Sequence, residues 1–239
     1  MHLVVGTPMF GGMCCSQYVS SLIGLKEAMM QHGHQMTPIF IGNESLIPRA
    51  RNLLAHLFLK TDASHLLFMD ADQEFRPNDV ALMLKADKDI ITGIVPMKGI
   101  NWEGVEKGIK AKKKPYEPFT GIFNFQPLDK HKMKDANTPF EIKYGGSGFM
   151  LIKRQVFEQM IPTTDFYTNG GASIGKAKVY NFFKVENIGE ELLSEDYSFC
   201  QKYRTMGGKI WAAPWCEVGH FGSYCFRGKY VNDLTKLNS

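Results

Sequence analysis

Two aspartates separated by one residue, Asp70 and Asp72, follow directly on an apolar run at residues 66–69. Such a run predicts a buried strand, so both carboxylates would lie at the carboxyl end of that strand. Carboxylates this close repel each other, and a site that keeps both charged usually supplies a cation. Their hard oxygen ligands favour Mg²⁺ or Mn²⁺, and either ion also binds phosphates. The alternative for an isolated Asp-x-Asp is a solvated turn followed by a helix cap.

A histidine near the end of the chain is a second candidate metal ligand. His220 lies between Gly219 and Gly222, which would let the backbone approach a ligand closely. A lone histidine is more often an ordinary surface or hydrogen-bonded residue. Imidazole is softer than Mg²⁺ prefers, so ligation by His220 would favour Mn²⁺.

Glu195 and Asp196 open a predicted helix for which Ser194 is a plausible N-cap. Negative side chains are favoured at this position by the helix dipole alone. A carboxylate that faces a hydroxyl group can instead act as a general base. The glycine-rich segment at residues 145–148 is followed by a strand pattern, which argues against a phosphate-cradling loop. It indicates either close backbone packing under a ligand or a plain tight turn.

Short apolar segments alternate with amphipathic ones through the first 95 residues, and this alternation predicts a parallel sheet. In such a sheet, ligands gather at the carboxyl ends of the strands, where Asp70 and Asp72 lie. We expect strands at residues 2–5, 36–41, 65–69 and 89–95, and helices at 16–31, from Pro48 and from Arg76.

The pattern after Pro96 is less regular. Alternating runs at residues 119–125, 140–144 and 149–152 predict a mixed sheet, and 209–212 predicts a final short strand. Five lysines between Lys107 and Lys114 predict a solvated, mobile loop.

Composition limits the class of protein. A chain of 239 residues with 44% hydrophobic content can bury a substantial core within one domain. A formal charge of +4 is too small and dispersed to require nucleic acid. Five cysteines without a Cys-x-x-Cys spacing argue against a disulfide framework and a zinc site, and so favour a reducing compartment. No stretch approaches the ~18 apolar residues of a membrane span, so we expect a soluble, cytoplasmic protein.

Several of these segments occur in an order typical of GT-A fold glycosyltransferases. The chain resembles the family-two type of inverting enzymes and their viral and phage relatives from Val4 to about Tyr230. The segments that carry the resemblance are Val5-Gly6-Thr7-Pro8, Pro48-Arg49-Ala50-Arg51-Asn52, Phe68-Met69-Asp70-Ala71-Asp72, Gly145-Gly146-Ser147-Gly148-Phe149, Ser194-Glu195-Asp196 and Gly219-His220-Phe221-Gly222.

The resemblance implies a single α/β domain over residues 1–239 with the GT-A fold. Its Rossmann-like, mostly parallel central sheet would be flanked by helices, with a smaller mixed sheet on the acceptor side. Residues 1–95 would form the nucleotide-binding half and residues 96–239 the acceptor and catalytic half.

The same resemblance assigns roles to individual residues. Asp72, His220 and Asp70 would bind the metal, and Asp70 would also face the ribose of the donor. Asp196 would deprotonate the acceptor, with Glu195 as a hydrogen-bonding neighbour or substitute. The remaining donor contacts would come from Thr7, Pro8, Arg51, Asn52 and Ala71, and the sugar contacts from Gly146, Ser147, Lys98 and Trp102.

Two of these assignments have alternatives. Tryptophans are more often packed in or near a core than stacked on a sugar, which weakens the role of Trp102. The acidic residue that reads uracil in the family has no clear counterpart after the second strand, where Asn43 or Glu44 would substitute.

These residues together predict an enzyme that uses Mn²⁺ or Mg²⁺ to transfer a sugar to a hydroxyl acceptor such as a glycan. A hexose from a UDP-sugar, for example UDP-glucose, is the favoured donor, and inversion is expected. Neither nucleic acid nor a membrane span is expected, the oligomeric state stays open, and a viral protein would act in the host cytoplasm. The alternatives are a non-catalytic binding module and a nucleotidyltransferase, although residues 6–12 lack the basic residue that the latter needs.

Overall fold

The computed structural model describes residues 1–128, 135–170 and 175–230, so the last nine residues of the predicted domain lie outside it. The helices are α1 (Ser16–Gln31), α2 (Ile47–Leu59), α3 (Pro77–Lys85), α4 (Trp102–Lys110), α5 (Arg154–Met160) and α6 (Glu195–Thr205). None of these described helices is both long and apolar enough to cross a bilayer.

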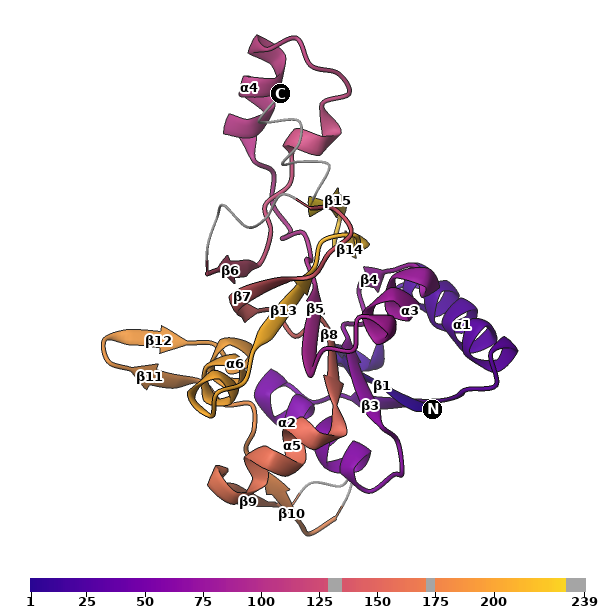
Figure 1. Cartoon of the computed structure of the whole chain (residues 1–239), viewed down its shortest axis with the longest axis vertical. Coiled ribbons are helices and arrows are strands. Elements are labelled where there is room, and N and C mark those ends of the chain that lie inside the picture. The colour runs from indigo at the N-terminus through magenta and orange to yellow at the C-terminus, as the bar shows by residue number, and fades with distance from the viewer. Residues whose placement is uncertain (129–134, 171–174, 231–239) are drawn as a thin grey trace.

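The strands of the main sheet follow the order β2-β1-β3-β8-β5-β13-β7-β6 (Figure 1). Their bounds are β1 (His2–Met9), β2 (Gln35–Gly42), β3 (His65–Met69), β5 (Ile90–Gly93), β6 (Phe125–Pro127), β7 (Phe140–Gly145), β8 (Phe149–Lys153) and β13 (Ile210–Ala213). The pairs β1·β2, β1·β3 and β5·β13 are parallel, whereas β7 and β8 run antiparallel to their neighbours. The predicted mostly parallel arrangement therefore holds for strand direction, since only β7 and β8 oppose the rest of this sheet.

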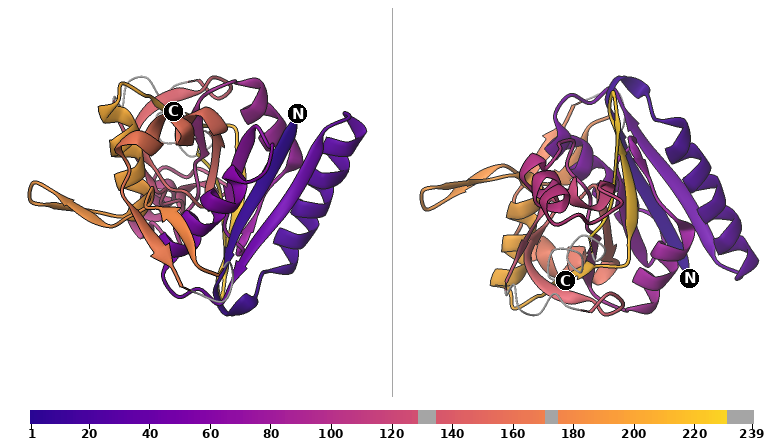
Figure 2. Two further views of the ribbon diagram at one scale, coloured as in Figure 1. Left: turned by 90° about the horizontal axis from the view of Figure 1, so that it is seen from below. Right: turned by 90° about the horizontal axis from the view of Figure 1, so that it is seen from above.

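Helices cover both faces of the sheet, and its central strands β3, β5 and β8 are buried on both sides. Along β3, Leu66 and Phe68 pack in a layer with α2, α5 and α6, whereas Leu67 and Met69 pack with α1 and α3. This alternation follows from the two-residue period of a strand. The views along the long axis place α1 on the opposite side from the protruding hairpin of β11 (Glu186–Ile188) and β12 (Glu191–Leu193) (Figure 2).

A smaller antiparallel sheet consists of β15 (Cys225–Lys229), β14 (Glu217–Phe221) and β4 (Gln73–Glu74). It places His220 opposite Gln73, one residue after Asp72. The segments 140–144 and 149–152, which were predicted to lie in a mixed sheet, form β7 and β8 of the main sheet, whose strand pairs are both parallel and antiparallel.

The segment after Pro96 differs most from its prediction. The prediction of a solvated loop for the lysine-rich segment is wrong in part, because the helix α4 extends to Lys110. Asn101 caps this helix by accepting a hydrogen bond from the Gly104 amide at 2.9 Å. The prediction of a strand at 119–125 is also wrong. Phe119 instead ends a short 3₁₀-helix, η2 (Glu117–Phe119), and packs against α4. Only Phe125, at the end of that range, enters a strand.

Candidate active site

A cleft of about 410 Å³ opens where β1 and β3 end. Of the predicted site residues, Pro8, Arg51, Asp70, Ala71 and Asp72 line it. Its other walls come from the β1–α1 connection, the β2–α2 connection and the start of α2, and consist of Phe10, Met13, Cys14, Cys15, Glu44, Ser45 and Ile47. The cleft therefore lies at the carboxyl ends of parallel strands, as the sequence predicted.

Backbone hydrogen bonds hold the three residues of the Asp-x-Asp segment. The Asp70 amide donates to the Gly148 carbonyl at 2.9 Å, and the Ala71 carbonyl accepts from the Cys15 amide at 2.9 Å. The Asp72 carbonyl accepts from the Phe221 amide at 2.8 Å. Segments from three distant parts of the chain thus fix both carboxylates at the rim.

Arg51 forms the buried centre of the site, with only 4% of its side chain exposed. Its guanidinium lies 3.0 Å from Asp70 Oδ1 and 3.4 Å from Glu195 Oε1, and it also donates to the Ser147 carbonyl at 3.4 Å. Burial opposes the charged guanidinium, but the nearby carboxylates outweigh it, and the pKa of Arg51 is raised. Arg51 therefore joins the Asp-x-Asp segment to the start of α6.

Asp72 faces the ammonium group of Lys98 and the imidazole of His220. Its Oδ2 lies 2.6 Å from Lys98 Nζ, and its Oδ1 lies 3.5 Å from His220 Nε2. Burial raises the pKa of Asp72, but the hydrogen bonds from His220 and Lys98 dominate and lower it. Burial likewise opposes charge on His220, whereas its bonds to Asp72 and to the Pro96 carbonyl raise its pKa.

The pair of Asp72 and His220 fits a divalent cation in its chemistry. His220 Nδ1 lies 2.8 Å from the Pro96 carbonyl, which accepts a hydrogen bond from the ring N–H and leaves Nε2 directed at Asp72. An aspartate oxygen and an imidazole nitrogen form a donor set suited to Mn²⁺. Within the described ranges no three such ligand side chains come together, so the remaining ligands would come from phosphate and water.

Asp196 lies at the first turn of α6. Its Oδ1 accepts hydrogen bonds from the Ser194 hydroxyl and, at 2.8 Å, from the Tyr197 amide. A methyl group placed on Gly146 would lie 3.7 Å from the other oxygen, Oδ2. The Ser194 hydroxyl thus donates a hydrogen bond to Asp196. It does not accept one from the backbone amides of α6, as an N-cap side chain would.

The glycine turn (residues 145–148) connects the two groups of carboxylates. A Cβ atom on Gly148 would lie 2.7 Å from Asp70 Oδ2, and one on Gly146 would face Asp196. A side chain at Gly148 would therefore have to displace the ends of Asp70 and Gln73, and one at Gly146 would have to displace the Asn124 amide, 2.9 Å away. Between them, the Ser147 hydroxyl is buried and has no hydrogen-bond partner in the described structure.

Three predicted contacts lie away from the cleft or are engaged elsewhere. Asn52 is buried, and its amide group bonds to Asn181 and to both backbone groups of Phe183. The Thr7 hydroxyl is buried against the Tyr18 hydroxyl at 2.6 Å. Trp102 is 70% exposed on α4.

Sequence reasoning missed the apolar wall formed by Phe10, Met13 and Ile47. Phe10 and Met13 are 77% and 70% exposed, which is unusual for large apolar side chains. The only sequence signal was their position in the loop that follows the first strand.

No protein-family model and no curated protein matches the sequence. Among solved structures, A197 from STIV has a TM-score of 0.51 at 16% identity, covering 93% of this chain and 86% of that one. GalNAc-T7, crystallised with UDP, GalNAc and Mn²⁺, has a TM-score of 0.52 at 15% identity, covering 96% of this chain. This chain spans only 44% of the GalNAc-T7 chain.

The chain has the GT-A fold. These identities establish the fold alone, so the activity has to be argued from the geometry of the cleft.

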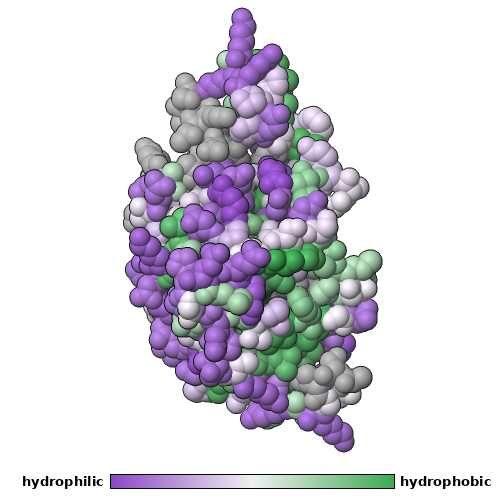
Figure 3. All heavy atoms as spheres, turned by 90° about the vertical axis from the view of Figure 1, so that its right-hand side faces the viewer, coloured by the Kyte–Doolittle hydropathy of each residue, from purple (hydrophilic) through white to green (hydrophobic). Residues whose placement is uncertain are grey.

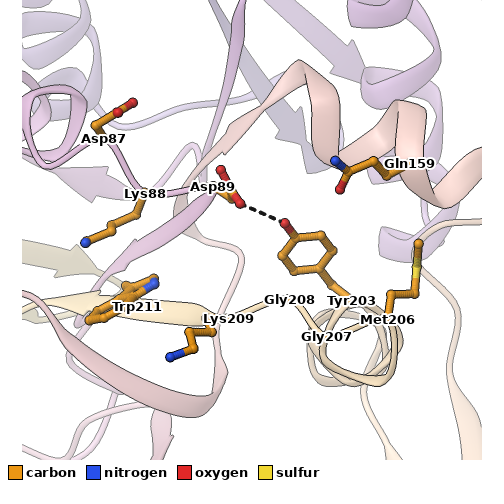
Figure 4. A pocket seen from close by; sticks show the side chains of 10 residues that line it. All are labelled: Asp87, Lys88, Asp89, Gln159, Tyr203, Met206, Gly207, Gly208, Lys209 and Trp211. Atoms are coloured by element: carbon orange, nitrogen blue, oxygen red, sulfur yellow. Dashed lines mark hydrogen bonds between the residues drawn. The ribbon is translucent and has the colours of Figure 1, made fainter.

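A second hollow of about 670 Å³ lies at the opposite end of the GT-A sheet, before β5 and β13 begin (Figure 4). Its central contact is a hydrogen bond from the Tyr203 hydroxyl to Asp89 at 3.0 Å. Asp87 and Asp89 are both paired with Lys153, and Lys88 covers the ring of Trp211 at 4.2 Å. Although larger, this hollow contains none of the predicted site residues.

Proposed function

We propose that the protein is a divalent-metal-dependent glycosyltransferase. It transfers a hexose from a UDP-sugar, for example UDP-glucose, to a hydroxyl acceptor such as a glycan, with inversion at the anomeric carbon. The observation that carries this proposal is that Asp72 of the cleft pairs with His220, while the glycine turn contacts Asp70 of the cleft at Gly148 and faces Asp196 at Gly146.

The donor nucleotide would occupy the cleft between the β1–α1 connection and α2. Phe10, Met13 and Ile47 offer apolar surface to the base and ribose, and Asp70 lies at the ribose end. Glu44 is the acidic residue nearest the predicted uracil-reading position, but Arg49 binds it at 2.5 Å. Support for UDP and Mn²⁺ comes from the GT-A neighbour crystallised with both.

The diphosphate would lie beside Asp72, where Mn²⁺ or Mg²⁺ would be held by Asp72 and His220. When bound, such an ion neutralises charge that grows on the leaving diphosphate. Lys98 already places an ammonium group at Asp72, and it would add positive charge on the same side of the diphosphate.

Asp196 would serve as the general base. Its Oδ1 is occupied by Ser194 and the helix amide, which orients Oδ2 toward the glycine turn and the sugar site. Glu195 is less suited to this role because it forms a buried ion pair with Arg51. A base opposite the leaving phosphate is the arrangement that direct displacement requires.

Replacement of two carboxylates tests the proposal. We expect Asp72→Asn to lower Mn²⁺-dependent transfer from UDP-sugars by at least about 100-fold, since it removes an anionic metal ligand. We expect Asp196→Asn to lower transfer by about 100-fold or more while UDP binding is retained, because a general base contributes about that factor. A screen of UDP-sugars for hydrolysis and transfer, combined with calorimetric titration of UDP, measures both effects.

Asp165→Asn is the matched control, because Asp165 is exposed and lies outside the cleft. Full activity of folded Asp72→Asn would exclude the proposed metal site, and full activity of Asp196→Asn would exclude its role as base. A product with retained anomeric configuration would exclude direct inversion. Tight UDP binding without release of sugar would identify a binding module.

A further inference from the structure

The helix α4 has one packed side and one apolar exposed side. Gly104 and Gly108 are buried against η2, where added Cβ atoms would lie 2.5 Å from the Phe119 carbonyl and 2.9 Å from its ring. Trp102 and Ile109 are 70% and 52% exposed. At 3.6 residues per turn, Trp102, Val105 and Ile109 share a stripe turned away from the two glycines. The apolar stripe is therefore not the face that packs on the protein.

Lysines occupy the polar face of α4 and the segment directly after it, and Lys110 pairs with Glu106 at 2.5 Å. Five lysines lie between residues 102 and 114 (107, 110, 112, 113 and 114) against two glutamates, which gives this segment a charge of +3. The whole chain carries only +4, so thirteen residues account for most of its excess positive charge. We call residues 102–114 the α4 tip.

The α4 tip lies at one end of the long axis of the molecule, beyond the sheet and its flanking helices (Figure 1). The space-filling view shows hydrophilic atoms at the summit of this end with hydrophobic atoms beside them (Figure 3). Among the described residues, the α4 tip and the adjoining η2 thus form the part of the chain that a flat surface at this end would meet.

We propose that the α4 tip binds the surface of a lipid bilayer that contains anionic lipids. Lysines are attracted to anionic headgroups, and tryptophan prefers the boundary between headgroups and acyl chains. An amphipathic helix that carries both kinds of residue lies in the plane of that boundary. Nucleic acid would pair with the lysines but would give the Trp102–Ile109 stripe no apolar partner.

The base of the tip is bonded to the cleft. Lys98 pairs with Asp72, and the Pro96 carbonyl bonds to His220, just before α4 begins. Docking of the tip would thus hold the cleft at the membrane surface, and under the proposed function the acceptor would be a hydroxyl-bearing glycan displayed there. The lipid binding itself does not depend on the enzymatic proposal.

Co-sedimentation with vesicles tests the inference. We expect the full chain to bind phosphatidylcholine vesicles that contain phosphatidylglycerol and to bind pure phosphatidylcholine far less. Lys107→Glu/Lys110→Glu should weaken binding by at least about 25-fold, because each lysine near an anionic surface contributes about fivefold. Trp102→Ser should weaken it by at least about tenfold through lost apolar burial.

Matched controls separate the tip from general electrostatics. Lys60→Glu/Lys85→Glu makes the same change in net charge at exposed lysines on other elements, and Leu192→Ser removes an apolar residue that is 69% exposed on the β11–β12 hairpin. Both controls should bind vesicles nearly as well as the unmodified chain. Equal losses in the control and tip variants would overturn the proposal.

Tryptophan fluorescence gives an independent readout. Trp102 is the most exposed of the three tryptophans, whereas Trp215 is 7% exposed. Anionic vesicles should shift the emission to shorter wavelength, and Trp102→Phe should remove that shift while sedimentation persists. Absence of vesicle binding would overturn the proposal, as would tip-dependent binding of an oligonucleotide in its place. Sugar transfer to a soluble acceptor, measured without vesicles, tests the proposed function by itself. Failure of the lipid-binding proposal can therefore be told apart from failure of the proposed enzymatic activity.

Discussion

At the scale of single residues, Glu195 shows how the site keeps several carboxylates close together. Burial and the charge of Asp196 raise the pKa of Glu195, whereas Arg51 pulls it down without reversing the shift. The folded protein therefore binds this proton more tightly than the unfolded chain. Its stability should decline as pH rises from the ordinary value of 4.5 through the raised pKa.

Glu195→Gln tests this pH dependence, because glutamine resembles the protonated acid and does not titrate. We expect the free energy of unfolding of the variant, minus that of the unmodified chain, to increase between pH 4 and pH 7. The slope should reach at most about 1.4 kcal/mol per pH unit. Urea denaturation at several pH values measures this difference.

Asp196→Asn is the second variant in this experiment, since it removes the charge that helps to raise the pKa of Glu195. The pH-dependent difference between Asp196→Asn and its Glu195→Gln double variant should be smaller. Glu190→Gln, at an exposed position, controls for general effects of the substitution. A difference that does not change with pH would contradict the assigned environment of Glu195.

Individual side chains were predictable where their chemistry is local. Asp70 and Asp72 lie at the cleft because a strand ends just before them. Asn52 follows Arg51 on α2, yet it turns to the backbone of Phe183, 131 residues away, and nothing local in the sequence indicates that partner. Lys98 pairs with Asp72, although it was expected at the sugar.

At the scale of elements, the glycine turn (residues 145–148) positions carboxylates by close packing. A Cβ atom on Gly148 would lie 2.6 Å from Gln73 Nε2 and 2.7 Å from Asp70 Oδ2, both at the ends of side chains. We expect Gly148→Ala to fold, with a loss of about 1 kcal/mol or less, but to displace Asp70. Its kcat/KM for the donor should decrease at least about tenfold, as measured by steady-state kinetics.

Gly170→Ala is the control for this substitution, because no heavy atom of the described residues lies within 4 Å of the Cβ position there. It should leave both the kinetics and the stability unchanged. Unaltered kcat/KM in Gly148→Ala would show that the turn does not position the donor site.

Elements were most predictable where an apolar period repeats. The helices α1, α2 and α3 and the strands β1, β2, β3 and β5 lie close to their predicted positions. The helix α4 was missed because its glycines lower helix propensity, yet they are the residues that let it pack against Phe119. Phe119 was assigned to a strand because its packing partner lies on that unrecognised helix.

At the scale of the whole molecule, strand order was the least predictable property. β8 follows β3 by some 80 residues of chain, yet it lies between β3 and β5 in the sheet. This insertion brings the glycine turn beside Asp70, because Phe149 pairs with Met69. Register over such distances depends on side-chain packing that no local pattern records.

The same long-range arrangement divides the proposed donor site between the two halves of the chain. Asp72 and the cleft walls come from residues 1–95, whereas His220 and Lys98 come from the other half. A nucleoside diphosphate and a metal bound together would connect both halves, so we expect a larger thermal shift with UDP and Mn²⁺ than with either alone. At 100 times the Kd, binding adds about 2.7 kcal/mol, which raises the Tm of a chain of this size by about 5–10 °C.

Differential scanning fluorimetry with UDP, GDP, CDP and dTDP, each with and without Mn²⁺, measures this shift and ranks the bases. Asp72→Asn and His220→Ala should each remove the increment that depends on Mn²⁺ and retain the part due to UDP alone. Because the two residues belong to different halves, equal losses would indicate one shared metal site. If His220→Ala kept the full increment, the ion would be bound by the first half alone and His220 would only support Asp72.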